Sequence, residues 1–354
     1  VYMGNLANQS LPAVSSRARG SEIVKFYQSH ALFRDRYRVL KQLGKGGFGV
    51  TYLAQDTQLP SQPYCVIKQL CPKTTNQVAL ERAKLRFRRE ARALASLGSH
   101  SQIPRLLDYF TTGGEFYLVQ DYIHGQTLAQ EVRQQGRQTE AQVKYFLNEM
   151  IPVVDFLHQS RIIHRDIKPP NIIKSVPDRR LVLIDFGAVD EFLTAVDAVD
   201  IGQAAATQFI GTPGFAPPEQ LALRPCYGSD IYALGMTCLF LLTGRTPLEF
   251  TPDPQTGQVL WQHTVTISAH FANVLDKMLR PTPDDRYGSI AELRRDLALE
   301  PHLATLTKCM HLARPEETPS HQNSSLPPEG YLTPIQRQAH AIRNRRHKRV
   351  NQVS

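Results

Sequence analysis

Long hydrophobic runs and paired cysteines are missing from this 354-residue chain. No segment reaches the roughly 18 apolar residues that a membrane-spanning helix needs. The five cysteines are odd in number and lack the paired spacing of a metal site, so we expect reduced thiols. The first residues also lack a signal-peptide pattern. Together these absences predict a soluble, cytoplasmic protein.

Composition sets limits on the size and partners of the protein. With 42% hydrophobic residues the chain should be globular, and its length predicts two lobes or a domain with tails. The net charge of +9 raises nucleic-acid binding as one alternative. However, no recognition motif is present, and aromatic residues are not interleaved with the terminal basic residues. Nucleic acid is therefore not expected to be the main partner.

A short stretch, residues 162–171, concentrates three kinds of polar group. Asp166 precedes Lys168 by two residues and Asn171 by five, which fits neither a helical stripe nor an alternating strand face. The spacing indicates an irregular loop that directs these groups to one point, and such loops commonly serve a site. Soon afterwards an apolar strand ends in a second carboxylate, Asp185. Two acids, an amide and a lysine suit phosphoryl transfer assisted by a divalent metal.

These two stretches carry a family resemblance. His164–Asn171 and Asp185–Gly187 resemble the catalytic loop and metal-binding triplet of the eukaryotic-like (Hanks-type) serine/threonine protein kinases. The sequences of several motifs resemble those of bacterial, particularly cyanobacterial, members of this family. The resemblance implies an α+β, two-lobed fold, in which a small antiparallel sheet with one key helix adjoins a larger, mainly helical lobe. It also implies transfer of the ATP γ-phosphoryl group to Ser or Thr hydroxyls of protein substrates.

A glycine-rich turn precedes these motifs, at residues 44–49. A single GxGxxG pattern also fits a dinucleotide-binding fold, but that fold needs a helix directly after the last glycine. Here Val50–Ala54 alternates and is β-branched at its start, which favours a strand. The strand–turn–strand pattern therefore favours the glycine loop of kinases, whose amides approach phosphate.

Lys68 and Glu90 are predicted to form an ion pair. Lys68 lies on a predicted strand, residues 64–70, with Val66 on the same face. Glu90 lies on the apolar stripe of the next helix, formed by Leu80, Ala83, Phe87, Ala91 and Leu94, where a carboxylate needs a cation. Arg88, Arg89 and Arg92 are local alternatives for that partner. The family resemblance favours Lys68, which would then be held against the phosphates.

The resemblance implies roles for further residues. Asp166 takes the proton of the acceptor hydroxyl, Lys168 steadies the transferring group, and Asn171 and Asp185 bind Mg²⁺. The hydroxyl of Thr212 faces Asp166 and Lys168 and helps to select Ser or Thr acceptors. The implied ATP-binding residues are Leu43, Gly44, Lys45, Gly46, Gly47, Phe48, Gly49, Thr51, Val66, Lys68, Glu90, Gln120, Asp121, Ile123 and Ile173. Among these, Gln120 falls at the gatekeeper position, and the backbone of Asp121 and Ile123 would meet the adenine edge.

The segment between Asp185 and Glu219 resembles a kinase activation segment. Its candidate phosphorylation sites are Thr207 first and Thr194 second, although both also read as ordinary loop threonines. Arg286 stands where kinases place the buried partner of Glu219, so we expect that ion pair.

Three segments are predicted along the chain. Residues 1–36 form an extension that docks or stays loose, residues 37–301 form the kinase domain, and residues 302–354 form a flexible linker with a basic tail. Five basic residues between Arg343 and Arg349 crowd that tail. It reads as a solvated tail, or as a site for an acidic partner or an anionic surface. A pseudokinase scaffold is the alternative function, and it is disfavoured because the five site positions Lys68, Glu90, Asp166, Asn171 and Asp185 are all intact.

Helix signals complete the predicted large lobe. Thr139 and Gln142 form a capping-box pattern at the start of a long helix, in which Pro152 predicts a kink rather than an end. Residues 230–242 carry no charge after Asp230 and predict a central buried helix. Ser289 and Glu292 form a second capping-box pattern.

Overall fold

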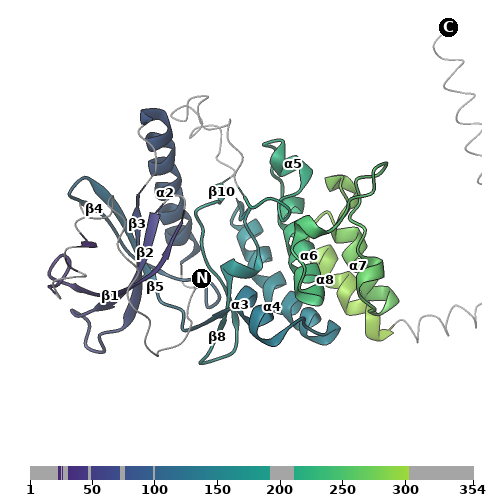
Figure 1. Ribbon diagram of the computed structural model, residues 1–354, viewed down its shortest axis with the longest axis horizontal. Coiled ribbons are helices and arrows are strands. Elements are labelled where there is room, and N and C mark those ends of the chain that lie inside the picture. Colours follow the sequence, from purple (N-terminus) through teal and green to yellow (C-terminus); the bar gives the residue numbers. More distant parts are fainter. Residues whose placement is uncertain are drawn as a thin grey trace, which may run out of the picture. The chain divides into compact units, whose positions relative to one another are not determined.

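The computed structural model describes residues 31–302 except 47–48, 72–75, 99 and 192–210, together with residues 23, 24 and 26. The predicted Thr194, Thr207 and basic tail lie outside the described residues. Up to residue 301, the fold is the predicted α+β arrangement of an antiparallel sheet with one long helix, followed by a mainly helical part (Figure 1). We call these two parts the small lobe and the large lobe.

The small lobe is built on a five-stranded antiparallel sheet in the order β1-β2-β3-β5-β4. On β3, Cys65 and Ile67 belong to the core on one face, whereas Lys68 and Val66 take the opposite face, as the period of two predicts. The strands are β1 (Tyr37–Lys45), β2 (Gly49–Asp56), β3 (Tyr64–Leu70), β4 (Leu106–Thr112) and β5 (Glu115–Asp121).

Residues N-terminal to β1 contribute to the core of this sheet. Ile23 and Phe33 are fully buried, and Val24 is buried with them in the cluster that contains Ile67. The ring of Phe33 lies 5.0 Å from that of Tyr117, centroid to centroid, within the range of favourable aromatic pairs. The N-terminal extension was predicted either to dock or to stay loose, and these described residues of it dock against the sheet.

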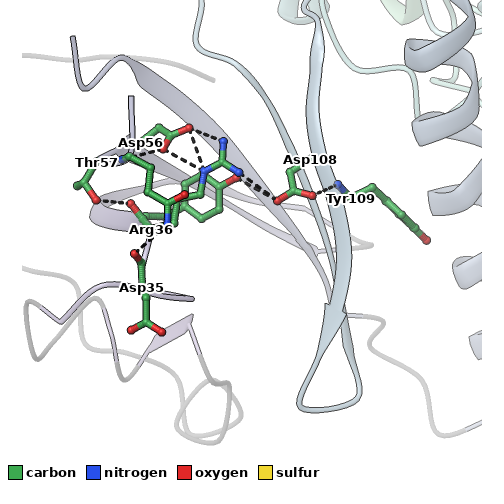
Figure 2. A network of polar contacts seen from close by, with 8 residues as sticks. Asp35, Arg36, Asp56, Thr57, Asp108 and Tyr109 are labelled. Atoms are coloured by element: carbon green, nitrogen blue, oxygen red, sulfur yellow. Dashed lines mark hydrogen bonds and ion pairs between the residues drawn. The ribbon is translucent and has the colours of Figure 1, made fainter. Parts of the chain in front are cut away.

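Arg36, directly before β1, binds acidic side chains on two other strands (Figure 2). Its guanidinium donates to both carboxylate oxygens of Asp56 at the end of β2, at 2.6 to 3.1 Å, and lies 3.8 Å from Asp108 on β4. Asp56 is almost fully buried and also accepts the backbone N–H of Gln58. The hydrogen bonds from Arg36 outweigh the effect of burial and hold the pKa of Asp56 below its ordinary value.

Helix α2 (Gln77–Leu97) packs beside the sheet. Asn76 caps its first turn by accepting the N–H groups of Val78 and Ala79. The predicted stripe is buried from Ala83 onward, but Leu80 is only half-buried because it lies in the first turn, near the end of the helix. Glu90 is buried on that stripe.

The large lobe surrounds α6, whose residues are buried on nearly every side, as predicted. Pro152 lies inside α4, which continues to residue 159 as expected, and Thr139 and Gln142 form the predicted capping box. The second box is only half formed, because Glu292 accepts the N–H of Gly288 instead of that of Ser289. The helices are α3 (Leu128–Gln135), α4 (Glu140–Gln159), α5 (Pro218–Leu221), α6 (Tyr227–Thr243), α7 (Ala269–Met278) and α8 (Ile290–Leu299).

Short strands and 3₁₀ turns complete this lobe. Strands β6 (Gly125–Thr127), β8 (Ile172–Ser175) and β9 (Leu181–Leu183) form one antiparallel sheet, and β7 (Ile162–Ile163) pairs with β10 (Asp190–Glu191). The turns are η2 (Pro169–Asn171), η5 (Pro247–Glu249), η6 (Gln262–Thr264), η7 (Pro283–Asp285) and η8 (Glu300–His302). In the described part of the chain, every helix is too short or too polar to cross a bilayer. The four cysteines described there are free thiols.

The Arg36–Asp56 pair generates a pH-dependent stability prediction. At pH 7, Asp56→Asn should lower the free energy of unfolding by about 2 kcal/mol, because it leaves the Arg36 guanidinium without its charged partner. The folded pKa of Asp56 lies below its ordinary value of 3.8, so the pair stabilises fully above that pH and loses its effect as the pH falls further. In urea titrations, the difference between wild type and variant should therefore narrow below pH 3.8. The exposed neighbour Asp35, changed to Asn, is the matched control, and a difference independent of pH would contradict the assignment.

Candidate active site

Three predicted residues meet at one point of the large lobe. The loop between β7 and η2 brings Asp166 and Lys168 together, with Lys168 Nζ 2.7 Å from Asp166 Oδ2. Thr212 joins them from a distant part of the chain. Its hydroxyl donates to Asp166 Oδ1 at 2.7 Å and accepts from Lys168 Nζ at 2.6 Å. A hydroxyl of the Ser/Thr type is thus held between a carboxylate and an ammonium group.

Asn171 is turned toward the same carboxylate. Its amide nitrogen donates to the backbone carbonyl of Asp166 at 2.9 Å and to the carboxylate at 3.0 Å. These bonds use the nitrogen and leave the side-chain oxygen as the atom available to a cation. The backbone carbonyl of Asn171 accepts the N–H of Ile184, which ties this loop to the residue before Asp185. The amide oxygen of Asn171 and the carboxylate of Asp185 are hard oxygen donors of the kind that Mg²⁺ prefers, so these two residues fit that ion.

The catalytic loop is anchored by Asp230, whose role was not predicted from the sequence. Its carboxylate is fully buried at the start of α6 and accepts the backbone N–H groups of His164 and Arg165, each at 2.9 Å. His158 Nε2 lies 3.0 Å from the same carboxylate. Burial raises the pKa of Asp230, but these hydrogen bonds and the neighbouring imidazoles outweigh it and hold the pKa below its ordinary value. The available signal was a lone acid on an otherwise uncharged buried helix.

Arg165 connects the loop to the residues after Asp185. Its backbone has a positive φ of 65°, which turns the chain sharply before Asp166. Its guanidinium donates to the backbone carbonyls of Ala188, at 2.5 Å, and Val189, at 2.9 Å. Its own carbonyl accepts from Gln220, which was also not predicted from the sequence. The loop is therefore held from both sides.

Asp185 and Gly187 face the small lobe. Asp185 also has a positive φ, 69°, and its carboxylate lies 3.2 Å from Lys68 Nζ. The Lys68 ammonium lowers the pKa of Asp185 to about 2, so the group is ionised, and 49% of its side chain remains exposed. A side chain at Gly187 would meet Glu90 Oε2 at 3.3 Å and Asp185 Oδ1 at 3.4 Å, tighter than most real contacts. Glycine therefore permits this approach of the two lobes.

The predicted Lys68–Glu90 ion pair is confirmed, with Nζ 2.5 Å from Oε1. Burial raises the pKa of Glu90, and the ammonium of Lys68 opposes that rise. No ion pair joins Glu90 to the neighbouring arginines of α2 among the described residues. Lys68 thus binds one carboxylate from α2 and one from the large lobe.

The predicted nucleotide-binding residues come from neighbouring strands. Paired positions across the sheet include Gly44 with Thr51, Thr51 with Lys68, and Val66 with Gln120. A side chain at Gly49 would lie 2.0 Å from the carbonyl oxygen of Gln69, so only glycine fits there.

The remaining predicted positions lie at the ends of these strands and in the large lobe. Leu43 and Lys45 lie at the end of β1, followed by Gly46, while Gly47 and Phe48 lie outside the described residues. Ile123 packs against the cluster containing Ile173. The N–H of Asp121 donates to Arg105 and is therefore engaged within the protein.

The predicted Glu219–Arg286 pair is also confirmed. Two parallel hydrogen bonds, at 2.6 and 2.9 Å, join the guanidinium to the carboxylate. The side chain of Arg286 is fully buried and also donates to the carbonyls of Gly228, Arg280 and Pro281. This pair joins the end of the segment that carries Thr212 to the α7–α8 connection.

Sequence comparison decides the family. The profile of the protein kinase domain matches residues 37–297. The chain belongs to the protein kinase family. Serine/threonine-protein kinase B of Synechocystis sp. is 50% identical over 260 residues, which are 73% of this chain and 45% of that protein. Serine/threonine-protein kinase PknA of Nostoc sp. is 44% identical over 270 residues, 76% of this chain and 48% of that protein.

A more distant relative matches a similar share of the chain. Serine/threonine-protein kinase PknF of Mycobacterium tuberculosis is 30% identical over 277 residues, 74% of this chain and 55% of that protein. The predicted likeness to cyanobacterial kinases is confirmed. The chain spans about half the length of these curated kinases. A protein kinase domain uses ATP, whereas the roles of individual site residues remain predictions.

The buried Glu219–Arg286 pair generates a stability prediction. Arg286→Ala should lower the free energy of unfolding by about 3–5 kcal/mol, because it leaves the Glu219 carboxylate unpaired in a mostly buried site. Lys84→Ala is the control, since Lys84 pairs with Glu81 at the surface of α2 and should cost less than about 1 kcal/mol. Urea denaturation measures both variants, and equal losses would show that burial adds nothing to the Arg286 pair.

Proposed function

We propose that this chain is a serine/threonine protein kinase that transfers the γ-phosphoryl group of ATP to hydroxyl groups of protein substrates. The observation that carries this proposal is the position of the Thr212 hydroxyl, between Asp166 Oδ1 and Lys168 Nζ. An acceptor Ser or Thr brings the same functional group. The closeness to named serine/threonine-protein kinases supports the choice of acceptor.

Asp166, Lys168 and Lys68 have different roles in the proposed reaction. Asp166 accepts the hydrogen bond of the acceptor hydroxyl and takes its proton as the oxygen attacks phosphorus. Lys168, which donates to the Thr212 hydroxyl, balances negative charge on the transferring group. Lys68, fixed by Glu90, binds the phosphates of ATP.

Asn171 and Asp185 are the proposed Mg²⁺ ligands. When bound, Mg²⁺ would neutralise the negative charge that develops on the phosphate oxygens. The ammonium of Lys68 lowers the pKa of Asp185, which favours the ionised form that binds a cation. The hydrogen bonds of Asn171 to Asp166 place the proposed metal ligand beside the proposed base.

Autophosphorylation is the proposed route of control. Thr207 and Thr194 lie in the segment that resembles an activation segment, with Thr207 the first candidate. A map of phosphorylated residues after incubation of the purified protein with Mg·ATP tests this step independently of any external substrate. Phosphate at neither threonine would contradict it.

Replacing the proposed base tests the catalytic role directly. Asp166→Asn keeps the shape of the side chain but cannot take a proton, so turnover on a generic protein substrate should fall by about 10²- to 10⁴-fold. Nucleotide affinity, measured by fluorescence titration, should be retained because Asp166 is not among the proposed ATP contacts. Asp284→Asn, at an exposed aspartate of the same lobe, is the matched control and should leave turnover unchanged. Full turnover in Asp166→Asn would refute the assignment.

A further inference from the structure

A groove of about 450 Å³ adjoins the site where the acceptor hydroxyl is proposed to bind. Pro169 and Pro170, which directly follow Lys168 in the catalytic loop, form one of its walls. Phe215 forms another wall, and its N–H donates to the carbonyl of Thr212 at 3.1 Å. Two of its walls are therefore continuous with the loops that hold the Asp166–Lys168–Thr212 triad. A peptide advances about 3.3 Å per residue, so a few residues beside the acceptor would reach the groove.

The walls of the groove are mostly apolar. Ala129 and Val132 of α3 and Pro247 of η5 line it, and Phe240 is a partly exposed side chain on the otherwise buried α6. Beyond the groove, Leu248 is 76% exposed. The N–H of Gln138, after α3, donates to the carbonyl of Leu241 on α6, which joins two of the elements that line the groove. The groove therefore offers an apolar surface to apolar side chains of a substrate.

The charged side chains that line the groove are all basic. Arg133 and Arg137 are the charged residues that line it, both are exposed, and neither has an ion-pair partner in the described ranges. The acidic residue of α3, Glu131, is instead paired with Lys174 at 2.6 Å. Glu249, next to the groove in η5, accepts the N–H and hydroxyl of Thr246. The two arginines are thus available to an external anion.

We propose that this groove binds the residues that flank the phosphorylated Ser or Thr and selects apolar and acidic side chains over basic ones. The proposal rests on the proposed kinase function and names its substrate class. Unpaired guanidinium groups favour carboxylates and repel lysine or arginine, so discrimination comes from both attraction and repulsion. Nucleic acid is also anionic, but the continuity of the groove with the hydroxyl site favours a peptide.

Residues 187–201 of the chain itself supply a suitable test peptide, GAVDEFLTAVDAVDI. Thr194 is its single hydroxyl acceptor, with acidic residues on both sides and apolar residues between them. A matched basic peptide replaces Asp190, Glu191, Asp197 and Asp200 by Lys, and a neutral peptide replaces the same four by Gln. Because the acids lie on both sides, the test does not depend on which flank enters the groove.

Steady-state phosphorylation of the three peptides measures the selection. We expect wild type to show a kcat/KM at least about tenfold higher for the acidic than for the basic peptide. The double variant Arg133→Glu and Arg137→Glu should abolish or reverse this preference, mainly through KM, because the groove then repels acids. Arg294→Glu with Arg295→Glu, on the exposed face of α8, changes the net charge equally and should keep the preference. Equal use of acidic and basic peptides by wild type, or a preference unaffected by the groove variant, would overturn the proposal.

A binding measurement separates this proposal from the proposed kinase activity. Fluorescence anisotropy of the labelled peptides, with the Asp166→Asn protein and Mg·ATP, detects groove binding without turnover. Tighter binding of the acidic peptide, lost in the Arg133/Arg137 variant, supports the groove even if no peptide is phosphorylated. Phosphorylation of a generic protein without any preference among the peptides contradicts only the groove. Binding of a single-stranded oligonucleotide through the same arginines, without peptide binding, would overturn the assignment to a peptide.

Discussion

The buried carboxylate of Asp230 is the constraint on which the rest of the site depends. It accepts the backbone N–H groups of His164 and Arg165, so the chain must leave β7 in one particular path. A carboxylate with no exposed surface is costly unless it is fully hydrogen-bonded, and here the backbone of the catalytic loop supplies those bonds. The central helix α6 therefore fixes where Asp166 points.

A second group of charges joins the two lobes at Lys68. Its ammonium lies between Glu90 on α2 and Asp185 after β9, at 2.5 and 3.2 Å. Moving α2 away would leave the buried Glu90 carboxylate without its cation, which is energetically expensive. The position of α2 is thus coupled to the residue that we propose binds the metal. A side chain at Gly187 would lie 3.3 Å from Glu90 Oε2, so the glycine leaves room for this carboxylate beside Asp185.

The substrate side of the site is organised by different forces. Thr212 is held by hydrogen bonds to Asp166 and Lys168, and the segment that carries it ends at the buried Glu219–Arg286 pair. The adjoining groove has apolar walls and two unpaired arginines within the described structure. Chemistry and selection therefore use neighbouring but separate sets of residues, so specificity can change without altering the proposed base.

Sequence alone determined the parts of this protein that are encoded by local pattern. The glycine turn, the alternating strand with Lys68, the helix with Glu90 and the uncharged central helix follow from periodicity and composition, and motif order identified the family. The resemblance also paired Lys68 with Glu90 and Glu219 with Arg286. The prediction of the second capping box was half wrong, because Glu292 accepts the N–H of Gly288 rather than that of Ser289. Either N–H lies within reach of a side chain in the first helical turn, so the pattern could not choose between them.

Only the tertiary structure decided the roles of Asp230 and Gln220, the burial of Ile23 and Phe33 against the sheet, and the groove beside the acceptor site. Asp230 is 65 residues from Arg165 in the sequence, and Gln220 is 55 residues from it. No local period links such positions, because their contact depends on how helices and loops pack. The groove is likewise a property of several elements together, since α3, the catalytic loop and the end of α6 acquire a common surface only when they fold against one another.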